Sequence, residues 1–170
     1  MHCHLSHHKI LGVALWLASS VLHAQALPPP KDKVVLTVSG AIGKTNGAGV
    51  AQFDTAMLNS LPQHTIRTRT PWYPDVSEFR GPLLADVLAL VEAKGSMISA
   101  SALNDYSVSV PMQDAREHRV VIAILLNGKP MSIRDKGPLF LVYPFDSKPE
   151  LRASTYYERS IWQLKSLTLK

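Results

Sequence analysis

The chain has 170 residues, a formal charge of +5, hydrophobic residues at 46% of its positions and a single cysteine. This length is typical of one domain with a sizeable core, and the mild positive charge favours acidic or phosphate-bearing partners. Because the basic residues are scattered along the chain, the sequence does not predict nucleic-acid binding.

The first 26 residues have the pattern of a secretory signal peptide. Lys9 precedes an apolar run over residues 10–22, and the small residues at 24–26 offer a site for a signal peptidase. The apolar run is shorter than the roughly 20 residues that span a bilayer, so a retained anchor is the weaker alternative. We expect export, cleavage, and a periplasmic or secreted mature chain of residues 27–170 that does not span a membrane.

Removal of this segment would also remove most of the candidate metal ligands. Cys3 and five of the seven histidines lie within it, and His64 and His118 remain in the mature chain. These two histidines are isolated, without a partner at zinc-ligand spacing. The mature chain is therefore expected to hold no zinc and no haem, and to form no disulfide.

The mature chain begins with predicted elements of both kinds. Residues 34–40 are rich in β-branched side chains that alternate, which indicates a strand. Residues 43–49 follow as a glycine-rich loop; a phosphate-binding cradle is the alternative, but no strand-loop-helix context supports it. Asp54 is suited to cap a short amphipathic helix over residues 53–61.

A strand, a loop and a helix are predicted next. Residues 64–70 alternate and predict a strand with Arg67 and Arg69 on one face. Residues 71–81 contain two prolines and end at a glycine, so they are expected to form a loop. A proline then opens the helix with the clearest apolar stripe in the chain, over residues 82–94.

Strands and polar turns are predicted through the second half of the chain. The expected strands cover residues 97–103, 106–111, 119–128, 139–144 and 160–169. Residues 112–118 are expected to form a turn or one helical turn, and Asn127 with Gly128 a tight turn. The sum is an α+β fold, a single strand-rich domain with mixed sheets and two short helices.

Four stretches resemble, in the same order, segments of the molybdopterin-binding domain of the sulfite-oxidase family. They are EFRGPLLADVL (78–88), ALNDYSVSVP (102–111), VVIAILLNGKPMSIRDKGPLFLVYP (120–144) and RSIWQLKSLTL (159–169). In that family the corresponding segments open a helix, form a D-G-Y turn, form an N-G-x-P-L turn with a cofactor-contacting H-G-x-P-L-R loop, and end the domain. The resemblance covers nearly all of the mature chain and implies the fold of that domain.

The chain departs from this family at the metal. The family's molybdenum-ligating cysteine lies four residues before a tryptophan, which is Trp72 here, so Thr68 takes its place. A threonine hydroxyl stays protonated and cannot supply a soft anionic ligand. In the cofactor loop, Lys136 with Gly137 stands where the family has His-Gly, and Phe140 takes the arginine position. The resemblance leaves molybdopterin as a candidate cofactor, not an assured one, and implies no metal ligand from the protein.

The resemblance also places several side chains around one mouth of the domain. The predicted cofactor-binding residues are Arg67, Arg69, Tyr73, Asp105, Tyr106, Arg134 and Lys136, with Arg80 as a further cation. Because guanidinium groups bind phosphate in a two-point geometry, the cations are expected to converge on an anion. The alternatives are a solvated strand edge for the two neighbouring arginines and a plain turn at residues 104–106. Trp72 and Trp162 are expected to pack in the core.

Three functions follow from these observations. The leading hypothesis is a binding module for a pterin-like or other phosphate-bearing ligand, or a partner of a membrane-bound sensor or redox protein. The second is an active molybdenum-dependent oxidoreductase that holds the metal through the pterin dithiolene alone, with Thr68 or water completing the shell. The third is a structural interaction domain. No catalytic residue is assigned in any of them.

Overall fold

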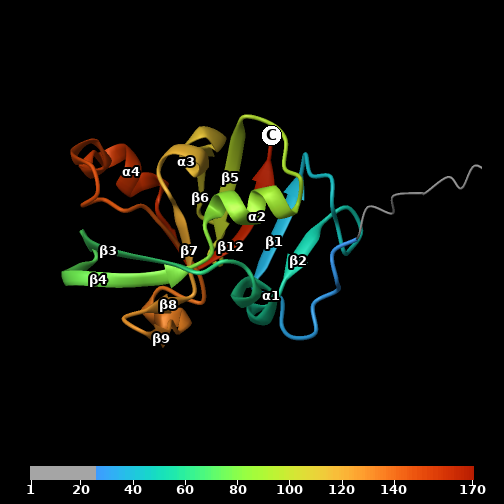
Figure 1. The fold of residues 1–170 in the computed structure, drawn as a ribbon, viewed down its shortest axis with the longest axis horizontal. Helices are drawn as coiled ribbons and strands as arrows, with labels where there is room; N and C mark the ends of the chain where they lie inside the picture. Colours follow the sequence, from blue (N-terminus) through green and yellow to red (C-terminus); the bar gives the residue numbers. More distant parts are fainter. Residues whose placement is uncertain (1–25) are drawn as a thin grey trace, which may run out of the picture.

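Three β-sheets and four α-helices make up residues 26–170, the part of the chain that the computed structural model describes (Figure 1). The predicted signal peptide lies outside these residues, except for Ala26. Within the described range no helix is long and apolar enough to cross a bilayer. The α+β class, strand-rich with mixed sheets, is confirmed, whereas the expected two helices are four.

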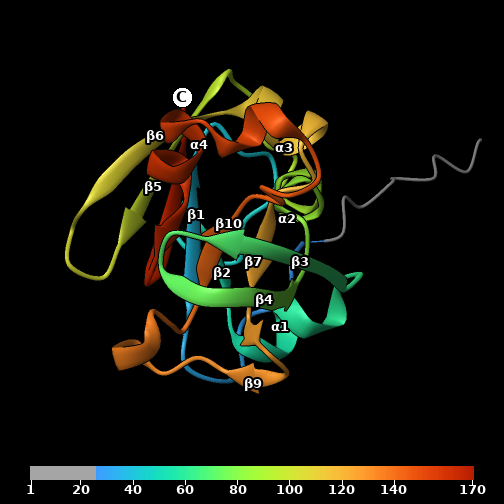
Figure 2. The ribbon, with the colours of Figure 1, turned by 90° about the vertical axis from the view of Figure 1, so that its left-hand side faces the viewer.

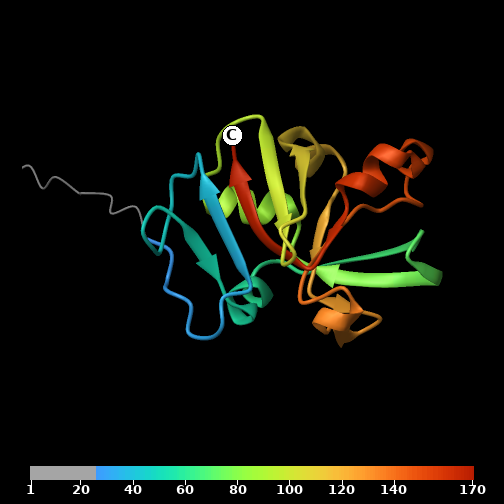
Figure 3. The same ribbon diagram turned by 180° about the vertical axis from the view of Figure 1, so that it is seen from behind.

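The largest sheet has five strands in the order β2, β1, β12, β5, β6. Its strands are β1 (Leu36–Gly40), β2 (Ala51–Phe53), β5 (Met97–Ala102), β6 (Ser107–Pro111) and β12 (Leu164–Leu169). β1 and β12 are parallel and the other pairs are antiparallel, so the sheet is mixed. Leu36 and Val38 are fully buried, as the alternating pattern of the first strand predicts. Figure 3 shows β1, β12 and β5 side by side from behind.

The first helix, α1 (Thr55–Ser60), begins where the sequence predicts. The Asp54 carboxylate accepts a hydrogen bond of 2.8 Å from the backbone N–H of Met57 and so caps the helix. Backbone N–H groups of Lys31 and Asp32 donate to the same carboxylate at 2.7 and 3.1 Å. The hydrogen bond from Met57 is the largest cause of a lowered pKa at Asp54, and the other bonds add to it. The bonds from Lys31 and Asp32 also tie the segment before β1 to the domain.

The second helix, α2 (Leu84–Leu90), is shorter than the predicted range of 82–94. Leu83 is bridged to Val121 in an antiparallel pair, so the chain is still extended there and the helix starts one residue later. The predicted apolar stripe is confirmed, because Leu84, Val87 and Leu88 are buried. α2 lies against one face of the five-stranded sheet (Figure 1).

The hairpin of β3 and β4 is the main departure from the predicted elements. β3 (His64–Thr70) is confirmed, but residues 71–81, expected to be a loop, form a two-residue turn followed by β4 (Tyr73–Gly81). Pro71 lies in the turn. Pro74 lies where the pairing register shifts, and a proline without an N–H is tolerated at such a bulge.

Two short strands complete a four-stranded sheet with the hairpin, in the order β3, β4, β8, β9. They are β8 (Leu125–Leu126) and β9 (Lys129–Pro130). Asn127 and Gly128 join them with φ angles of 49° and 79°, which confirms the predicted tight turn. In this order β3 is an edge strand.

The third sheet has three strands in the order β11, β10, β7. They are β7 (Val121–Ala123), β10 (Phe140–Val142) and β11 (Ile161–Trp162). All of β7 and β10 is buried, which agrees with the continuous apolar runs in the sequence.

Two predicted strands are broken in the structure because the chain changes sheet within them. The apolar run at 119–128 bends at Ile124, so that β7 pairs with β10 and β8 pairs with β4. The last predicted strand breaks at Gln163, whose φ of 52° separates β11 from β12. β7 and β8 are both apolar, and β11 with β12 forms one imperfectly alternating run, so the sequence pattern does not reveal either break.

The remaining helices are short. α3 (Met112–Glu117) forms where a turn or one helical turn is predicted. α4 (Ser154–Arg159) is not predicted, because its six residues include no buried side chain and so no apolar stripe. Two 3-10 helices, η1 (Ile133–Asp135) and η2 (Pro149–Arg152), lie in the connections.

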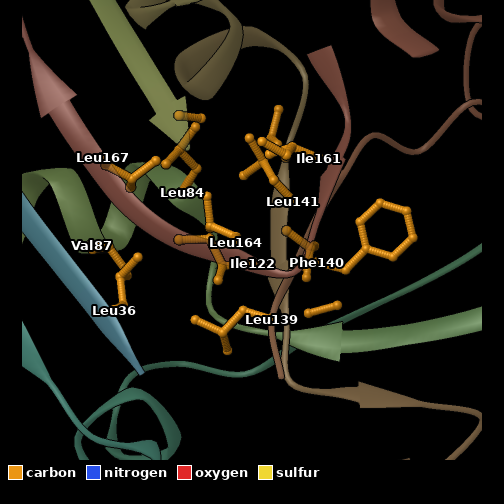
Figure 4. Packing of buried hydrophobic residues seen from close by; sticks show 14 of the residues in the cluster. Leu36, Leu84, Val87, Ile122, Leu139, Phe140, Leu141, Ile161, Leu164 and Leu167 are labelled. Carbon is orange, nitrogen blue, oxygen red and sulfur yellow. The ribbon is translucent and has the colours of Figure 1, made fainter. Parts of the chain in front are cut away.

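One hydrophobic core joins the five-stranded and three-stranded sheets. Figure 4 shows side chains from both sheets and from α2 meeting there, among them Leu36, Leu84, Val87, Ile122, Leu139, Phe140, Leu141, Ile161, Leu164 and Leu167. Leu27 is 7% exposed and belongs to this core, so the first residues of the predicted mature chain are part of the folded domain. The hairpin of β3 and β4 projects from this body (Figure 1), and it lies below α4 when the molecule is seen from that side (Figure 2).

Candidate functional site

A cavity of about 480 Å³ opens between three segments that are distant in the sequence. The turn of the β3–β4 hairpin, the β5–β6 turn and the segment from α4 to β11 supply its walls. The lining residues are Pro71, Trp72, Ala102, Asn104, Tyr106, Tyr157, Glu158, Ser160, Ile161 and Trp162. We call this hollow the aromatic cavity. Its volume is in the range of small-molecule sites in proteins.

Two tryptophans hold each other in place in the wall of the aromatic cavity. The ring of Trp72 meets that of Trp162 edge to face, with centroids 5.7 Å apart and planes at 77°. Trp72 also packs against Tyr157 at 6.2 Å and Phe140 at 5.3 Å. Because Phe140 is fully buried, this network anchors the hairpin turn to the core. The cavity wall is therefore rigid and aromatic, which suits a flat ring system.

Few polar groups face the aromatic cavity. Glu158 is the one charged side chain among its lining residues within the described range. Asn104 accepts a hydrogen bond from the backbone N–H of Tyr106 at 3.2 Å, and the Ser160 hydroxyl donates to a backbone carbonyl at 3.0 Å. The cavity itself thus offers stacking surfaces more than charge.

A cation lies on the outer side of this wall. The Lys136 ammonium is 5.0 Å from the ring centroid of Tyr73 and 5.9 Å from that of Trp162. This is the geometry of cation–π contacts. The Lys136 carbonyl accepts a hydrogen bond of 2.9 Å from the N–H of Gln163, which fixes the loop beside the β11–β12 break. Lys136 is therefore placed beside one aromatic wall of the cavity.

The hydroxyl of Tyr73, whose ring lies under the Lys136 ammonium, is buried and has no hydrogen-bond partner among the described residues. Desolvation, and second the charge of Asp135, raise the pKa of Tyr73. The hydroxyl therefore keeps its proton and has an unused donor. A buried polar group without a partner is rare in folded proteins, so this hydroxyl is an unusual feature beside the cavity wall.

The charged loop before β10 is ordered by its own side chains. Ser132 accepts from the N–H of Asp135 at 3.2 Å and donates to its carboxylate at 2.7 Å, which caps η1. Lys136 then takes a left-handed φ of 71°. At Gly137 a Cβ would lie 2.1 Å from the Met131 carbonyl oxygen, so only glycine fits. Arg134 is exposed on the outer side of this loop.

Thr68, at the place of the family's molybdenum ligand, is fully buried and engaged. Its hydroxyl accepts a hydrogen bond of 2.9 Å from the N–H of Asp146 and donates to the Arg69 carbonyl at 3.3 Å. In residues 26–170 no three His, Cys, Asp or Glu side chains gather as a metal site. The only cysteine, Cys3, lies outside that range. The described donor set therefore does not fit a molybdenum ion, although the cavity fits a pterin-sized ring.

The two predicted arginines of β3 lie away from Lys136. Arg67 lines a hollow of about 430 Å³ with His118 and Arg119, and Arg69 lines one of about 370 Å³ with Arg152. Neither hollow includes a residue of the charged loop. Arg80 is exposed farther along the hairpin, where β4 pairs with β8. The structure does not bring the predicted cations together around one anion, and their binding roles stay predictions.

Of the two predicted residues in the β5–β6 turn, Tyr106 lies at the aromatic cavity and Asp105 does not. Tyr106 is 54% exposed and lines the aromatic cavity. Asp105 has a φ of 65°, and its carboxylate accepts a hydrogen bond of 2.5 Å from the Lys165 ammonium. This bond, followed by the attraction between the two charges, lowers the pKa of Asp105. Asp105 is therefore used in a surface ion pair.

Several residues of the aromatic cavity were not predicted from the sequence. Tyr157, Glu158 and Ser160 come from the unpredicted α4 and the residue that ends it. Trp162 was expected to be core, but it is 37% exposed and forms a wall. The sequence does contain a sign of this wall. Two adjacent tyrosines at 156–157 lie close to Trp162 in an otherwise polar stretch, which is unusual for a plain connection.

Comparison with known families agrees with the resemblance seen in the sequence. Residues 28–146 match the family described as the oxidoreductase molybdopterin binding domain. No curated protein matches the chain. The match covers more than half of the chain and includes the β3–β4 hairpin, the β5–β6 turn and the charged loop. The chain therefore belongs to the oxidoreductase molybdopterin-binding domain family, of the sulfite-oxidase type.

Proposed function

We propose that the protein is an exported binding module that holds a small, flat, anionic ligand of the pterin kind in the aromatic cavity. The observation that carries this proposal is the pair of interlocked tryptophans, Trp72 and Trp162, which line a cavity of about 480 Å³. Stacking on such rings binds heterocycles without requiring a metal. Family membership supports a pterin as the ring system.

Lys136 and Tyr73, which lie beside Trp162 but outside the lining of the aromatic cavity, are the groups proposed to receive the anionic end of a ligand that extends past Trp162. Within residues 26–170 Lys136 has no carboxylate at ion-pair distance, and the Tyr73 hydroxyl has no partner. A positive charge over the ring of a tyrosine whose hydroxyl has no partner suits a phosphate or carboxylate group. Both belong to segments in which the sequence predicted cofactor contacts.

An oxidoreductase that carries molybdenum is less well supported. The Thr68 hydroxyl is engaged as donor and acceptor, and the described residues offer no thiolate in its place. Residues 26–170 thus provide no side chain suited to completing the metal's coordination. We accordingly propose binding, with a membrane-bound sensor or redox protein as the partner that reads the occupied state.

Export is part of the proposal and has its own test. The pattern of residues 1–26 supports cleavage near Ala26, and Leu27 is the first buried residue of the described range, 26–170. We expect protein isolated from the periplasm or medium to begin at Leu27, as determined by intact mass. A cell-associated protein that retains residue 1 would contradict export and cleavage but leave the binding site untouched.

Tryptophan fluorescence tests the binding proposal directly. The chain has three tryptophans, and two of them line the aromatic cavity, so Trp16→Phe in the full chain leaves only reporters at the site. We expect titration with pterin-6-carboxylate to quench this emission with saturation. Lys136→Met should weaken binding by about fivefold, the scale of one partly exposed charge contact, and the exposed Lys94→Met should not. Emission unaffected by the pterin would refute the proposal.

A further inference from the structure

A second surface, distinct from the aromatic cavity, collects positive charge along β3. It consists of the two hollows of about 430 and 370 Å³ that flank Asp146, and we call it the basic groove. Five cationic side chains line it: Arg67, Arg69, Arg119, Lys148 and Arg152. Two carboxylates, Glu117 and Asp146, oppose them. The groove therefore has an excess of positive charge, whereas the aromatic cavity has no cation in its lining.

Asp146 pairs with Arg69 at 4.0 Å and Arg152 at 3.2 Å, and so neutralises part of the charge while it organises the groove. Its carboxylate accepts hydrogen bonds from the backbone N–H of Arg69 at 2.7 Å and from the side-chain guanidinium of Arg152 at 3.2 Å. Its own N–H donates to Thr68 at 2.9 Å, which locks this carboxylate against the edge strand. The side chains of Arg69 and Arg152 nevertheless remain 76% and 56% exposed. Each retains donors that face solvent.

The alternation of β3 places two of the cations on the outer face of the strand. Arg67 and Arg69 alternate with Ile66 and Thr68, and those two are buried, so the arginines must lie on the outer face of β3. Arg67 and Lys148 have no carboxylate at ion-pair distance within residues 26–170. The strand therefore presents unpaired charge as a consequence of its alternation.

The spacing of these charges identifies the kind of partner. Side chains two residues apart on an extended strand are roughly 7 Å apart, and alternate side chains of an extended peptide have the same spacing. β3 is also an edge strand, which an extended segment can follow. A flat anionic membrane fits less well, because the cations line recesses and two carboxylates lie among them.

We propose that the basic groove binds an extended acidic segment of a partner protein, with carboxylates on alternate residues. The proposal deepens the partner role stated above, but it requires no ligand in the aromatic cavity. Pro71 and Tyr157 line both the cavity and the groove, so the two sites are neighbours that share a wall. A partner held in the groove is thus in position to sense a ligand in the cavity.

Fluorescence anisotropy of a labelled peptide tests this proposal. The probe is an eight-residue peptide of alternating glutamate and serine, and the same peptide with glutamine for glutamate is its neutral control. We expect the full chain to bind the acidic peptide with an affinity that falls as salt rises. The double substitution of Arg67→Ser and Arg69→Ser should weaken binding by at least about fivefold, because two exposed ion pairs are lost.

A charge-matched double variant separates the groove from general attraction. Lys94 and Lys129 are exposed and line neither hollow, so Lys94→Ser with Lys129→Ser removes the same charge elsewhere. We expect this control to bind the acidic peptide like the original chain. Equal weakening in both double variants, or no binding by the original chain, would overturn the proposal.

Two further measurements distinguish the remaining explanations. The first is binding to phosphatidylglycerol vesicles. If the vesicles bind in a manner that requires Arg67 and Arg69, and the acidic peptide does not bind, the groove is assigned to membranes and the peptide proposal is overturned. Pterin-6-carboxylate should bind the arginine double variant and the original chain alike. That result would also show that the variant is folded, so a failure in the groove is separate from a failure in the cavity.

Discussion

Arg159 donates a hydrogen bond of 2.9 Å to the carboxylate of Asp114 and so ties α4 to α3. The buried Tyr143 hydroxyl donates to the same oxygen at 2.7 Å. Burial first, and then the bond to Asp114, raise the pKa of Tyr143. This contact holds the helix that supplies Tyr157 and Glu158 to the aromatic cavity.

Breaking this contact should destabilise the domain and disturb the cavity. Asp114→Ala leaves the Arg159 charge and the Tyr143 hydroxyl without their acceptor, and we expect a loss of about 3 kcal/mol in the free energy of unfolding by urea. Pterin binding should weaken as well, because α4 loses its anchor. Lys165→Met, at the exposed pair with Asp105, is the control and should leave the urea midpoint unchanged. If Asp114→Ala had the same urea midpoint as the original chain, other contacts would be shown to hold α4 in place.

Tyr73→Phe should separate stability from ligand binding. The substitution removes a hydroxyl without a partner, so we expect no loss of stability at pH 7, and weaker binding of pterin-6-carboxylate. A fall of more than about 1 kcal/mol in the free energy of unfolding at pH 7 would show that the hydroxyl is already bonded.

The same variant makes a prediction about alkaline pH. The pKa of Tyr73 is raised above its ordinary 10.0, so the unfolded chain loses this proton first. The contribution to stability is present below pH 10 and is lost as the pH rises through the folded-state pKa. Urea unfolding of Tyr73→Phe should therefore decline less steeply above pH 10 than that of the original chain. Parallel curves would contradict the raised pKa.

Gly137→Ala tests the role of the charged loop. The added Cβ would meet the Met131 carbonyl, so the backbone must shift, and we expect a loss of roughly 1–3 kcal/mol together with weaker pterin binding. Gly47→Ala, in an exposed loop where the nearest neighbour of the added Cβ would be a Val50 methyl group at 3.3 Å, is the matched control and should change neither quantity. Calorimetric melting and fluorescence titration provide the two readouts. Unchanged ligand affinity in Gly137→Ala would remove the loop from the site.

The state of Thr68 leads to a prediction about metal content. Because its hydroxyl is engaged within the protein, we expect exported protein from cells supplied with molybdate to contain far less than one molybdenum per chain. Elemental analysis of purified protein provides the measurement. One molybdenum per chain, lost in Thr68→Val, would contradict this account of the residue.

Local signals in the sequence predicted much of the fold. Asp54 predicted the start of α1, and the alternation at 64–70 predicted β3. Asn127 with Gly128 predicted the turn between β8 and β9. Each depends on neighbours in the chain. The breaks at Ile124 and Gln163 depend instead on which sheet the next strand joins, and that choice is made by distant residues.

The aromatic cavity was predicted less completely than the fold for a similar reason. Its walls come from three separate segments, and only the resemblance placed Tyr106 around the same mouth as Tyr73, the neighbour of Trp72. Trp162 alternates like a core residue, and alternation cannot distinguish a core from a cavity wall. The arginines of β3 were assigned to the same mouth as Lys136, whereas the strand's alternation directs them into the basic groove.

The most direct test of the central claim is calorimetric titration of pterin-6-carboxylate into two variants of the full chain. Trp162→Ala removes one aromatic wall of the cavity, and Thr68→Val removes the hydroxyl at the family's metal-ligand position. The account predicts saturable binding that is lost in Trp162→Ala and kept in Thr68→Val. Binding that survives Trp162→Ala and disappears with Thr68→Val would contradict it.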